Sequence, residues 1–232
     1  NLSDLVETAA PGMRVMRLMV PTVTDTPEAL EYMEEELAVL KGELDALAGR
    51  ETGDRELCES IALYNRCRGA LAGLKGSGLG NRALFAAHLA LQLMEPEEFL
   101  ALASSLPREP AGGEAGAPGG VGSGGVGVAL VGGPVSQLGL YDLLEDYGLR
   151  VVWDDLCTAS RFSAGPVAEN GKPLRSLAER YLGRRPCPTK LDARGRREEE
   201  LLKGLEASGA RGVVLAQQAF CEFHSFDYPG LK

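Results

Sequence analysis

The spacing of apolar residues changes about half-way along the chain. In the first hundred residues, apolar side chains recur every three or four positions, which is the spacing of one face of an α-helix. The stretch 27–48 shows this most clearly and has Pro27 at a favoured first helical position. Its apolar series is Leu30, Met33, Leu37, Leu40, Leu44 and Leu47. The pattern predicts a helix over 27–48 with this stripe facing a core.

Three more helices are predicted before residue 107. The second begins near Asp54, after which Leu57, Ile61, Tyr64 and Leu71 are expected to point inward. A third helix is predicted over 82–94 and a short fourth over 95–106. Residues 1–109 therefore form a mostly helical region in this interpretation.

The second half of the chain carries the pattern of an α/β fold. Residues 110–127 are rich in glycine and predict a linker or long loop. Strands are then predicted over 126–135, 149–157 and 210–220, and helices over 136–148, 173–183 and 196–209. Strands that alternate with helices indicate a parallel sheet with right-handed crossovers. We therefore predict an α/β protein in which a helical segment precedes a Rossmann-like domain over 128–232.

Composition and charge exclude some classes of partner. Apolar residues make up 44% of the 232 residues, and the net charge is −9. A surface this acidic repels the phosphate backbone, so a nucleic acid is not expected as a partner. No apolar run is long enough for a membrane span. Five cysteines, an odd number without a CxxC pair, favour a reducing, cytoplasmic setting over a disulfide framework.

Several candidate sites have a simpler structural interpretation. The "GSGLG" stretch at 76–80 follows a helix and lacks the GK[ST] of a phosphate loop. Cys58 and Cys67 are interpreted as small hydrophobic residues in a helix interface. His88 is interpreted as a structural histidine, whereas Cys187, between two prolines, has no clear role. The arginines near residues 184–197 are interpreted mainly as a solvated helix face.

Two cysteines follow strands at the carboxyl edge of the predicted sheet, where α/β proteins place their chemistry. Cys157 lies in "DDLCTASR" beside Asp154, Asp155 and Arg161. Cys221 lies in "FCEFHSFDYP" with Glu222, His224 and Asp227. Spacing alone favours a structural Cys157 and leaves Cys221 open between a buried thiol, a nucleophile paired with a histidine and an iron ligand.

Five motifs together resemble one family. "VPTVTDTPEALEYMEEELAVLKGELD", "LCESIALYNRCRGAL", "VVWDDLCTASRF", "LAERYLGRRPCP" and "AFCEFHSFDYPGLK" occur in this order and at fitting intervals. They resemble the 2-hydroxyacyl-CoA dehydratase family, which includes the related benzoyl-CoA reductase subunits. The resemblance covers nearly the whole chain, and "DDLCTASR" and "FCEFHSFDYP" are its strongest matches.

The resemblance implies a cofactor and a set of partners. Family members hold a 4Fe-4S cluster with three cysteines, and Cys221 matches the third of them by position. The other two belong to a domain that precedes this sequence, so the chain is expected to be a fragment that also lacks the extreme C-terminus and that holds no complete cluster by itself. The implied partners are a homologous second subunit, an ATP-dependent iron–sulfur activator and an acyl-CoA substrate.

The reaction implied by the resemblance is a radical elimination of water. An electron delivered by the activator converts the thioester into a ketyl radical, which expels the α-hydroxyl group. His224 is a candidate acid, base or supporting residue, and Asp154, Asp155 and Arg161 are expected mainly to shape their loop through an ion pair. A benzoyl-CoA-reductase-type subunit and a non-catalytic partner or assembly domain remain alternatives, and a hydrolase with a Cys/His pair is a more distant one.

Overall fold

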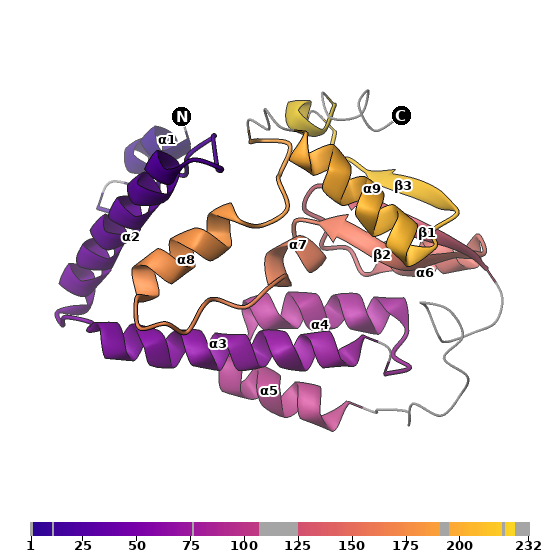
Figure 1. Cartoon of the computed structure of the whole chain (residues 1–232), viewed down its shortest axis with the longest axis horizontal. Coiled ribbons are helices and arrows are strands. Elements are labelled where there is room, and N and C mark those ends of the chain that lie inside the picture. The colour runs from indigo at the N-terminus through magenta and orange to yellow at the C-terminus, as the bar shows by residue number, and fades with distance from the viewer. Residues whose placement is uncertain are drawn as a thin grey trace. The chain divides into compact units, whose positions relative to one another are not determined.

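The computed structural model describes residues 2–10, 12–75, 77–106, 125–190, 195–219 and 221–225. Within them the chain forms two compact units. The first unit takes its residues from 1–61 and 167–183, and the second from 62–166 and 184–232. Figure 1 labels the helices and strands of both units.

The first unit consists of helices. It contains α1 (Leu2–Ala9), α2 (Pro27–Ala48), the first turns of α3 (Asp54–Leu74) and α8 (Pro173–Leu182). Helix α2 begins where the Thr26 hydroxyl accepts a hydrogen bond from the Ala29 amide, and it ends at Gly49 in the left-handed region.

Helices α2 and α8 pack together through small and flexible apolar side chains. Ala29 and Met33 of α2 meet Ala178 and Leu182 of α8, and all four are buried. The predicted apolar stripe of α2 is therefore correct in its first half. The prediction is wrong for the second half, because Leu44 is 48% and Leu47 63% exposed.

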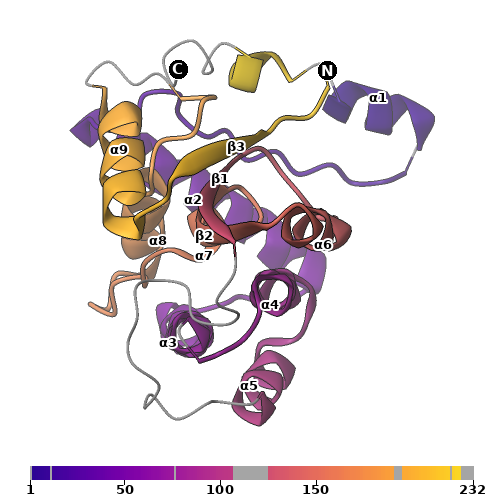
Figure 2. The same ribbon diagram turned by 90° about the vertical axis from the view of Figure 1, so that its right-hand side faces the viewer.

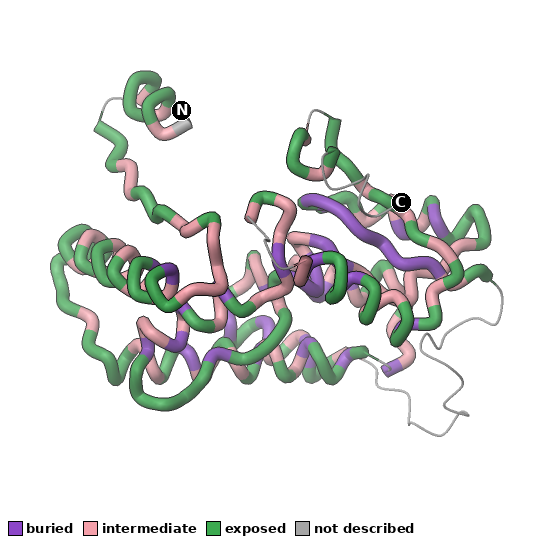
Figure 3. The backbone as a smooth tube through the Cα atoms, turned by 45° about the horizontal axis from the view of Figure 1, so that its top comes forward, coloured by how far each residue is buried: buried purple, intermediate pink, exposed green. Residues whose placement is uncertain are grey.

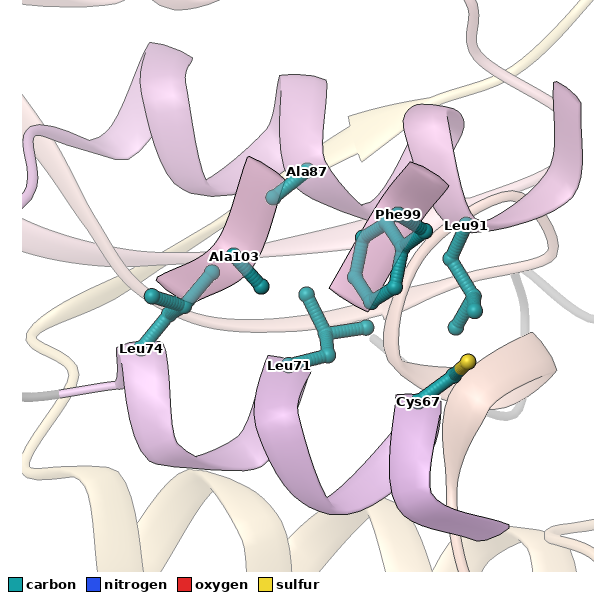
Figure 4. Packing of buried hydrophobic residues seen from close by; sticks show 7 residues of the cluster. All are labelled: Cys67, Leu71, Leu74, Ala87, Leu91, Phe99 and Ala103. Atoms are coloured by element: carbon teal, nitrogen blue, oxygen red, sulfur yellow. The ribbon is translucent and has the colours of Figure 1, made fainter. Parts of the chain in front are cut away.

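The helical layer of the second unit is built from the rest of α3 with α4 (Asn81–Leu93) and α5 (Pro96–Ser105). Figure 4 shows its core, in which Leu71 and Leu74 of α3 point toward Phe99 and Ala103 of α5, and Leu91 of α4 lies near Cys67. Cys67 is fully buried in this cluster, and its thiol donates to the Pro96 carbonyl over 3.4 Å, as expected of a structural thiol. Tyr64, expected to point inward, is 40% exposed.

A parallel three-stranded sheet forms the rest of the second unit. The strands β1 (Val126–Gly132), β2 (Leu149–Leu156) and β3 (Gly212–Ala216) lie in the order β2-β1-β3. Helix α6 (Gly139–Asp146) lies on one side of the strands and α9 (Arg196–Ser208) on the other, as Figure 2 shows. Figure 3 shows the burial that results, which is most complete along the central strand β1.

The fold class is confirmed as α/β, with a helical segment before a parallel sheet, although some details differ. Strand β1 ends at Gly132 rather than at residue 135, and the apolar pattern predicts neither the four-residue helix α7 (Ser160–Ser163) nor helix α1. The glycine-rich stretch 110–124 lies outside the described residues. Among the described helices, none combines the length and the apolar character that crossing a bilayer requires.

Candidate functional site

The carboxyl ends of the three strands come together at one edge of the sheet. The register pairs Gly132 of β1 with Leu156 of β2 on one side and with Ala216 of β3 on the other. From β1 the chain crosses to β2 through α6, and it later passes to the opposite side of β1 to form β3. In sheets with this 2-1-3 order, ligands bind outside the carboxyl ends at the point where the strand order reverses, which here lies between β1 and β3.

Two glycines allow β1 and β3 to approach closely at this point. A Cβ atom on Gly132 would overlap the carbonyl oxygen of Ala216, so a side chain there requires the backbone to move. The Gly133 amide donates to the same carbonyl over 3.2 Å. A Cβ atom on Gly133 would lie 3.4 Å from the imidazole ring of His224. The histidine therefore lies directly above the end of the central strand.

The β3 loop, defined here as residues 217–219 and 221–225, contains Cys221 and His224. Both residues are half-buried, whereas Glu222 is exposed. The Cys221 amide donates to the Gln218 carbonyl over 3.1 Å, and the Cys221 carbonyl accepts from the amide and the hydroxyl of Ser225 at 3.1 and 3.0 Å. The Gln218 side chain donates to the Pro134 carbonyl over 3.2 Å and so joins this loop to the turn after β1. Asp227 lies outside the described residues.

The end of β2 carries a different kind of structure, the Asp155 cluster, which consists of Asp155, Arg161, Arg185 and Arg197. Asp155 is fully buried at the end of the strand. Arg161 donates to both of its carboxylate oxygens, over 3.2 and 2.5 Å, and to its backbone carbonyl over 2.8 Å. Arg185 and Arg197 each donate to one carboxylate oxygen, over 2.5 and 3.2 Å.

The Asp155 cluster holds its carboxylate in the charged form. Burial alone would raise the pKa of Asp155, but the hydrogen bonds and charge of Arg161, with the charges of Arg185 and Arg197, outweigh burial and lower this pKa. Arg185 also stacks 4.8 Å above the Trp153 ring. The interpretation of these arginines as a solvated face is wrong for Arg197, which is buried and donates to the Pro186 carbonyl over 2.8 Å.

Asp154 takes part in the local turn rather than in the Asp155 cluster. One of its carboxylate oxygens accepts from the Ser160 amide over 2.9 Å and from the Leu156 amide over 3.3 Å. The Ser160 hydroxyl returns a bond to the Asp154 carbonyl over 2.6 Å. These bonds stabilise the turn between β2 and α7, so the Asp154 side chain has a structural role there.

Cys157 has two neighbours that the sequence did not predict, Arg161 and Cys187. Its sulfur accepts from Nη1 of Arg161 over 3.1 Å, and the neighbouring Cys187, together with burial, raises the pKa of the Cys157 thiol. The two cysteines are thirty positions apart, and no spacing rule connects them. The sequence pattern around Cys187, "RRPCP", did not indicate a role for it, and only the structure shows that it lies near Cys157.

His88 is buried on α4 beside the segment that follows β2. Its Nδ1 lies 3.1 Å from the Ser163 hydroxyl, and its Nε2 has no hydrogen-bond partner among the described residues. Burial lowers the pKa of His88, which favours the neutral ring. Gln92, one turn further along α4, donates to the Thr158 carbonyl over 2.8 Å, so this helix supports the end of β2.

The described residues do not form a complete metal site. Within the described ranges, no group of three or more His, Cys, Asp or Glu side chains is arranged to hold a metal ion. A 4Fe-4S cluster needs a set of thiolates, and the β3 loop supplies one such thiol, Cys221. These residues therefore fit one corner of a cluster and not a whole one.

Comparison with known proteins identifies the family. The family model for "2-hydroxyglutaryl-CoA dehydratase, D-component" matches residues 1–232. The chain belongs to this family. Its membership agrees with the resemblance carried by the five sequence motifs.

Three dehydratase subunits are similar to this family member. The β subunit of (R)-2-hydroxyglutaryl-CoA dehydratase from Acidaminococcus fermentans is 24% identical over 95% of this chain and 59% of its own length. Lactoyl-CoA dehydratase subunit β from Anaerotignum propionicum is 25% identical over 87% of this chain and 54% of its own. The (R)-phenyllactyl-CoA dehydratase β subunit from Clostridium sporogenes is 28% identical over 40% of this chain and 25% of its own. The matches thus cover from 25% to 59% of the lengths of these relatives, which is less than two thirds in each case.

Proposed function

We propose that this chain forms part of the β-type subunit of a 2-hydroxyacyl-CoA dehydratase, in which Cys221 is a ligand of a 4Fe-4S cluster. The observation that carries the proposal is the position of the β3 loop in a member of the D-component family. This loop lies at the reversal point of the sheet, against the glycine turn of β1.

The chemistry of Cys221 suits this role. A thiolate is the side chain that iron–sulfur clusters require, and a loop held at a strand end gives it a reproducible position. The backbone around Cys221 is fixed by hydrogen bonds from its amide and to its carbonyl, none of which uses the sulfur. The remaining ligands would come from the part of the protein outside this chain.

The cluster, when bound, would supply the single electron that makes loss of an α-hydroxyl group possible. The residues of this chain would hold the ligand loop in place and limit its movement. His224 lies close to Cys221 in sequence and next to Gly133, and in this proposal it would donate a proton or a hydrogen bond to the leaving hydroxyl group.

The proposed partners follow from the same reasoning. The relatives are named as β subunits, so we propose a second dehydratase subunit as a partner of this chain. An ATP-dependent activator would deliver the electron, and the substrate would be an acyl-CoA thioester. CoA carries phosphate groups, but Arg185 and Arg197 already bind Asp155, so the phosphates would be bound by other residues.

The test is a turnover assay on the native-length protein, assembled with its second subunit and reduced activator without oxygen. Three thioesters form the panel: 2-hydroxyglutaryl-CoA, lactoyl-CoA and phenyllactyl-CoA. We expect loss of water from at least one of them, at least 100-fold slower in Cys221→Ser and unchanged in Cys58→Ser. Cys58 is a suitable control because it is half-buried on α3 and belongs to the helical first unit.

Other outcomes would contradict the proposal. Reduction of benzoyl-CoA without loss of water from any 2-hydroxyacyl-CoA would indicate a reductase of the related type. No turnover and no iron in an assembled, folded complex would indicate a non-catalytic partner domain. Equal turnover in Cys221→Ser and the wild type would remove Cys221 from the reaction.

A further inference from the structure

The β1 turn, defined here as Gly133, Pro134 and Val135, leaves the sheet at the point where the strand order reverses. The parallel registers of β1 with β2 and with β3 both end at Gly132, so Val135 lies beyond the ladder of backbone bonds. Val135 is nevertheless buried and belongs to the core cluster that also contains Leu156. A buried amide and a buried carbonyl outside a ladder need hydrogen-bond partners from elsewhere.

The Thr158 hydroxyl group provides both partners. It accepts a hydrogen bond from the Val135 amide over 3.2 Å and donates one to the Val135 carbonyl over 2.5 Å. A hydroxyl group can accept and donate at the same time, so it takes the place of the next residue of a strand. Valine has nearly the same shape as threonine but can form neither bond, and Thr158→Val therefore isolates the contribution of the hydroxyl group.

The backbone of Thr158 is held by a neighbouring helix. Its carbonyl accepts from the Gln92 side chain of α4 over 2.8 Å, and the same side chain donates to the His88 carbonyl over 2.9 Å. Two residues after Thr158, the Ser160 amide donates to the Asp154 carboxylate over 2.9 Å. The hydroxyl group therefore reaches the β1 turn from a segment that other bonds keep in position.

The opposite side of the β1 turn is bonded to β3 and its loop. The Gly133 amide donates to the Ala216 carbonyl over 3.2 Å, and the Gln218 side chain donates to the Pro134 carbonyl over 3.2 Å. The Gln218 carbonyl accepts in turn from the Cys221 amide over 3.1 Å. The turn therefore lies between the end of β2 and the β3 loop and is bonded to both.

We propose that Thr158 is a positioning residue for the β3 loop. Its hydroxyl group holds the β1 turn against the end of β2, and the turn in turn restrains the loop that contains Cys221. Thr158 touches neither the substrate nor the cluster in this proposal and acts only through the turn. The restraint of the loop does not depend on the reaction, whereas its effect on catalysis rests on the proposed function.

The first test is hydrogen exchange of two backbone amides in the native-length protein. We expect the Val135 amide to exchange about tenfold faster in Thr158→Val, as for one lost hydrogen bond, and the Cys221 amide about threefold faster. Thr158→Ser keeps the hydroxyl group and should stay within about twofold of the wild type at both amides. Unchanged exchange of either amide in Thr158→Val would overturn the proposal.

Two further variants make the first test independent of a folding defect. Thr158→Ala removes the same two bonds without a branched side chain and should reproduce the faster exchange of both amides. Thr8→Val is the matched control, because Thr8 is exposed on α1 in the first unit and its hydroxyl donates only to the Asp4 carbonyl of the same helix. Circular dichroism checks that each variant is folded. Faster exchange in Thr8→Val as well would contradict a specific role of Thr158.

The second test measures turnover of the assembled complex with reduced activator, without oxygen. We expect kcat about tenfold lower in Thr158→Val, with KM within about twofold of the wild type, and recovery in Thr158→Ser. Turnover is expressed per bound cluster, because a purely structural loss lowers the number of active molecules and leaves this quantity unchanged. Equal kcat per cluster in Thr158→Val and the wild type would contradict a positioning role in catalysis. A wild-type complex without iron or turnover would instead overturn the proposed function, and the exchange rates would still decide whether Thr158 restrains the loop.

The third test combines the two ends of the hydrogen-bonded path. Gln218→Leu removes the bond from the β3 loop to the Pro134 carbonyl. Because Thr158 and Gln218 act through the same turn, we expect the double variant to lose less kcat than the product of the two single losses. Single losses that multiply in the double variant would show that the two residues act independently and would contradict the proposed path.

Discussion

The two strand ends that flank β1 contain similar kinds of residues but use them differently. At the end of β2, Asp155 is fully buried and its charge is shared among three arginines. In the β3 loop, Cys221 and His224 are half-buried, and the bonds that hold the loop involve backbone atoms and glutamine and serine side chains. The comparison indicates that buried ion pairs hold the β2 end, whereas hydrogen bonds of the backbone and of glutamine and serine side chains hold the β3 loop.

The largest loss of stability is expected from Asp155→Asn, which removes the charge that holds the end of β2 together. The change leaves three guanidinium groups beside a neutral amide, and removing one partner of a buried ion pair costs about 3–5 kcal/mol. Urea unfolding of the wild type and the variant measures the loss. Glu222→Gln, at an exposed position of the β3 loop, is the control and is expected to change stability by less than about 0.5 kcal/mol. Equal stability of Asp155→Asn and this control would contradict the structural role.

A smaller loss is expected from Gly132→Ala. The added methyl group overlaps the Ala216 carbonyl, so β1 and β3 must separate, and overpacking of this kind costs about 1–3 kcal/mol. Gly139→Ala is the matched control because its Cβ meets no atom within 4 Å. Thermal unfolding compares the two variants. If both behaved alike, the close approach of the two strands would not be a constraint.

Acid should reduce the contribution of the Asp155 cluster to folding stability. The folded pKa of Asp155 is lower than its ordinary value near 3.9, so its contribution to stability is complete above that value. The contribution is lost as pH falls through the folded pKa. The difference in Tm between the wild type and Asp155→Asn should therefore be constant from pH 7 to 5 and narrow below about pH 4. A difference that already narrows between pH 7 and 5 would exclude Asp155 as its source.

The smallest effect on stability is expected from His224→Gln. The ring lies against Gly133 at the surface of the sheet edge, and we expect a change of less than about 0.5 kcal/mol. Its effect on turnover should be larger, about 10- to 100-fold in kcat with little change in KM, if the ring donates to the leaving group. Turnover equal to that of the wild type would leave His224 with a structural contact only.

The sequence predicted the order of helices and strands because apolar spacing reports directly on burial. The apolar run of β1 and the alternation of strands with helices predicted a parallel sheet, which the structure confirms. Because both cysteine loops follow strands, the same pattern placed them at the carboxyl edge of this sheet. The family resemblance then singled out Cys221, a choice that spacing alone had left open.

Other features depend on contacts that no local pattern encodes. Leu44 and Leu47 fit a helical stripe equally well whether or not another helix covers them. Arg197 lies in the first turn of a helix rich in glutamate, which is typical of a solvated surface, yet it donates to Asp155, forty-two positions earlier in the chain. The contacts of Arg185 and Pro186 with the Asp155 cluster likewise arise from the return of the chain to the end of β2.

The most direct test of a cluster ligand in the β3 loop is iron content, with EPR, of the native-length protein purified without oxygen. The Cys221→Ser and Cys157→Ser variants are measured beside the wild type. We expect about four irons per cluster-bearing subunit in the wild type and in Cys157→Ser. Cys221→Ser should lose iron or show a three-iron signal. Loss of the cluster in Cys157→Ser, with an intact cluster in Cys221→Ser, would place the metal site at the other strand end and contradict the proposed role of the β3 loop.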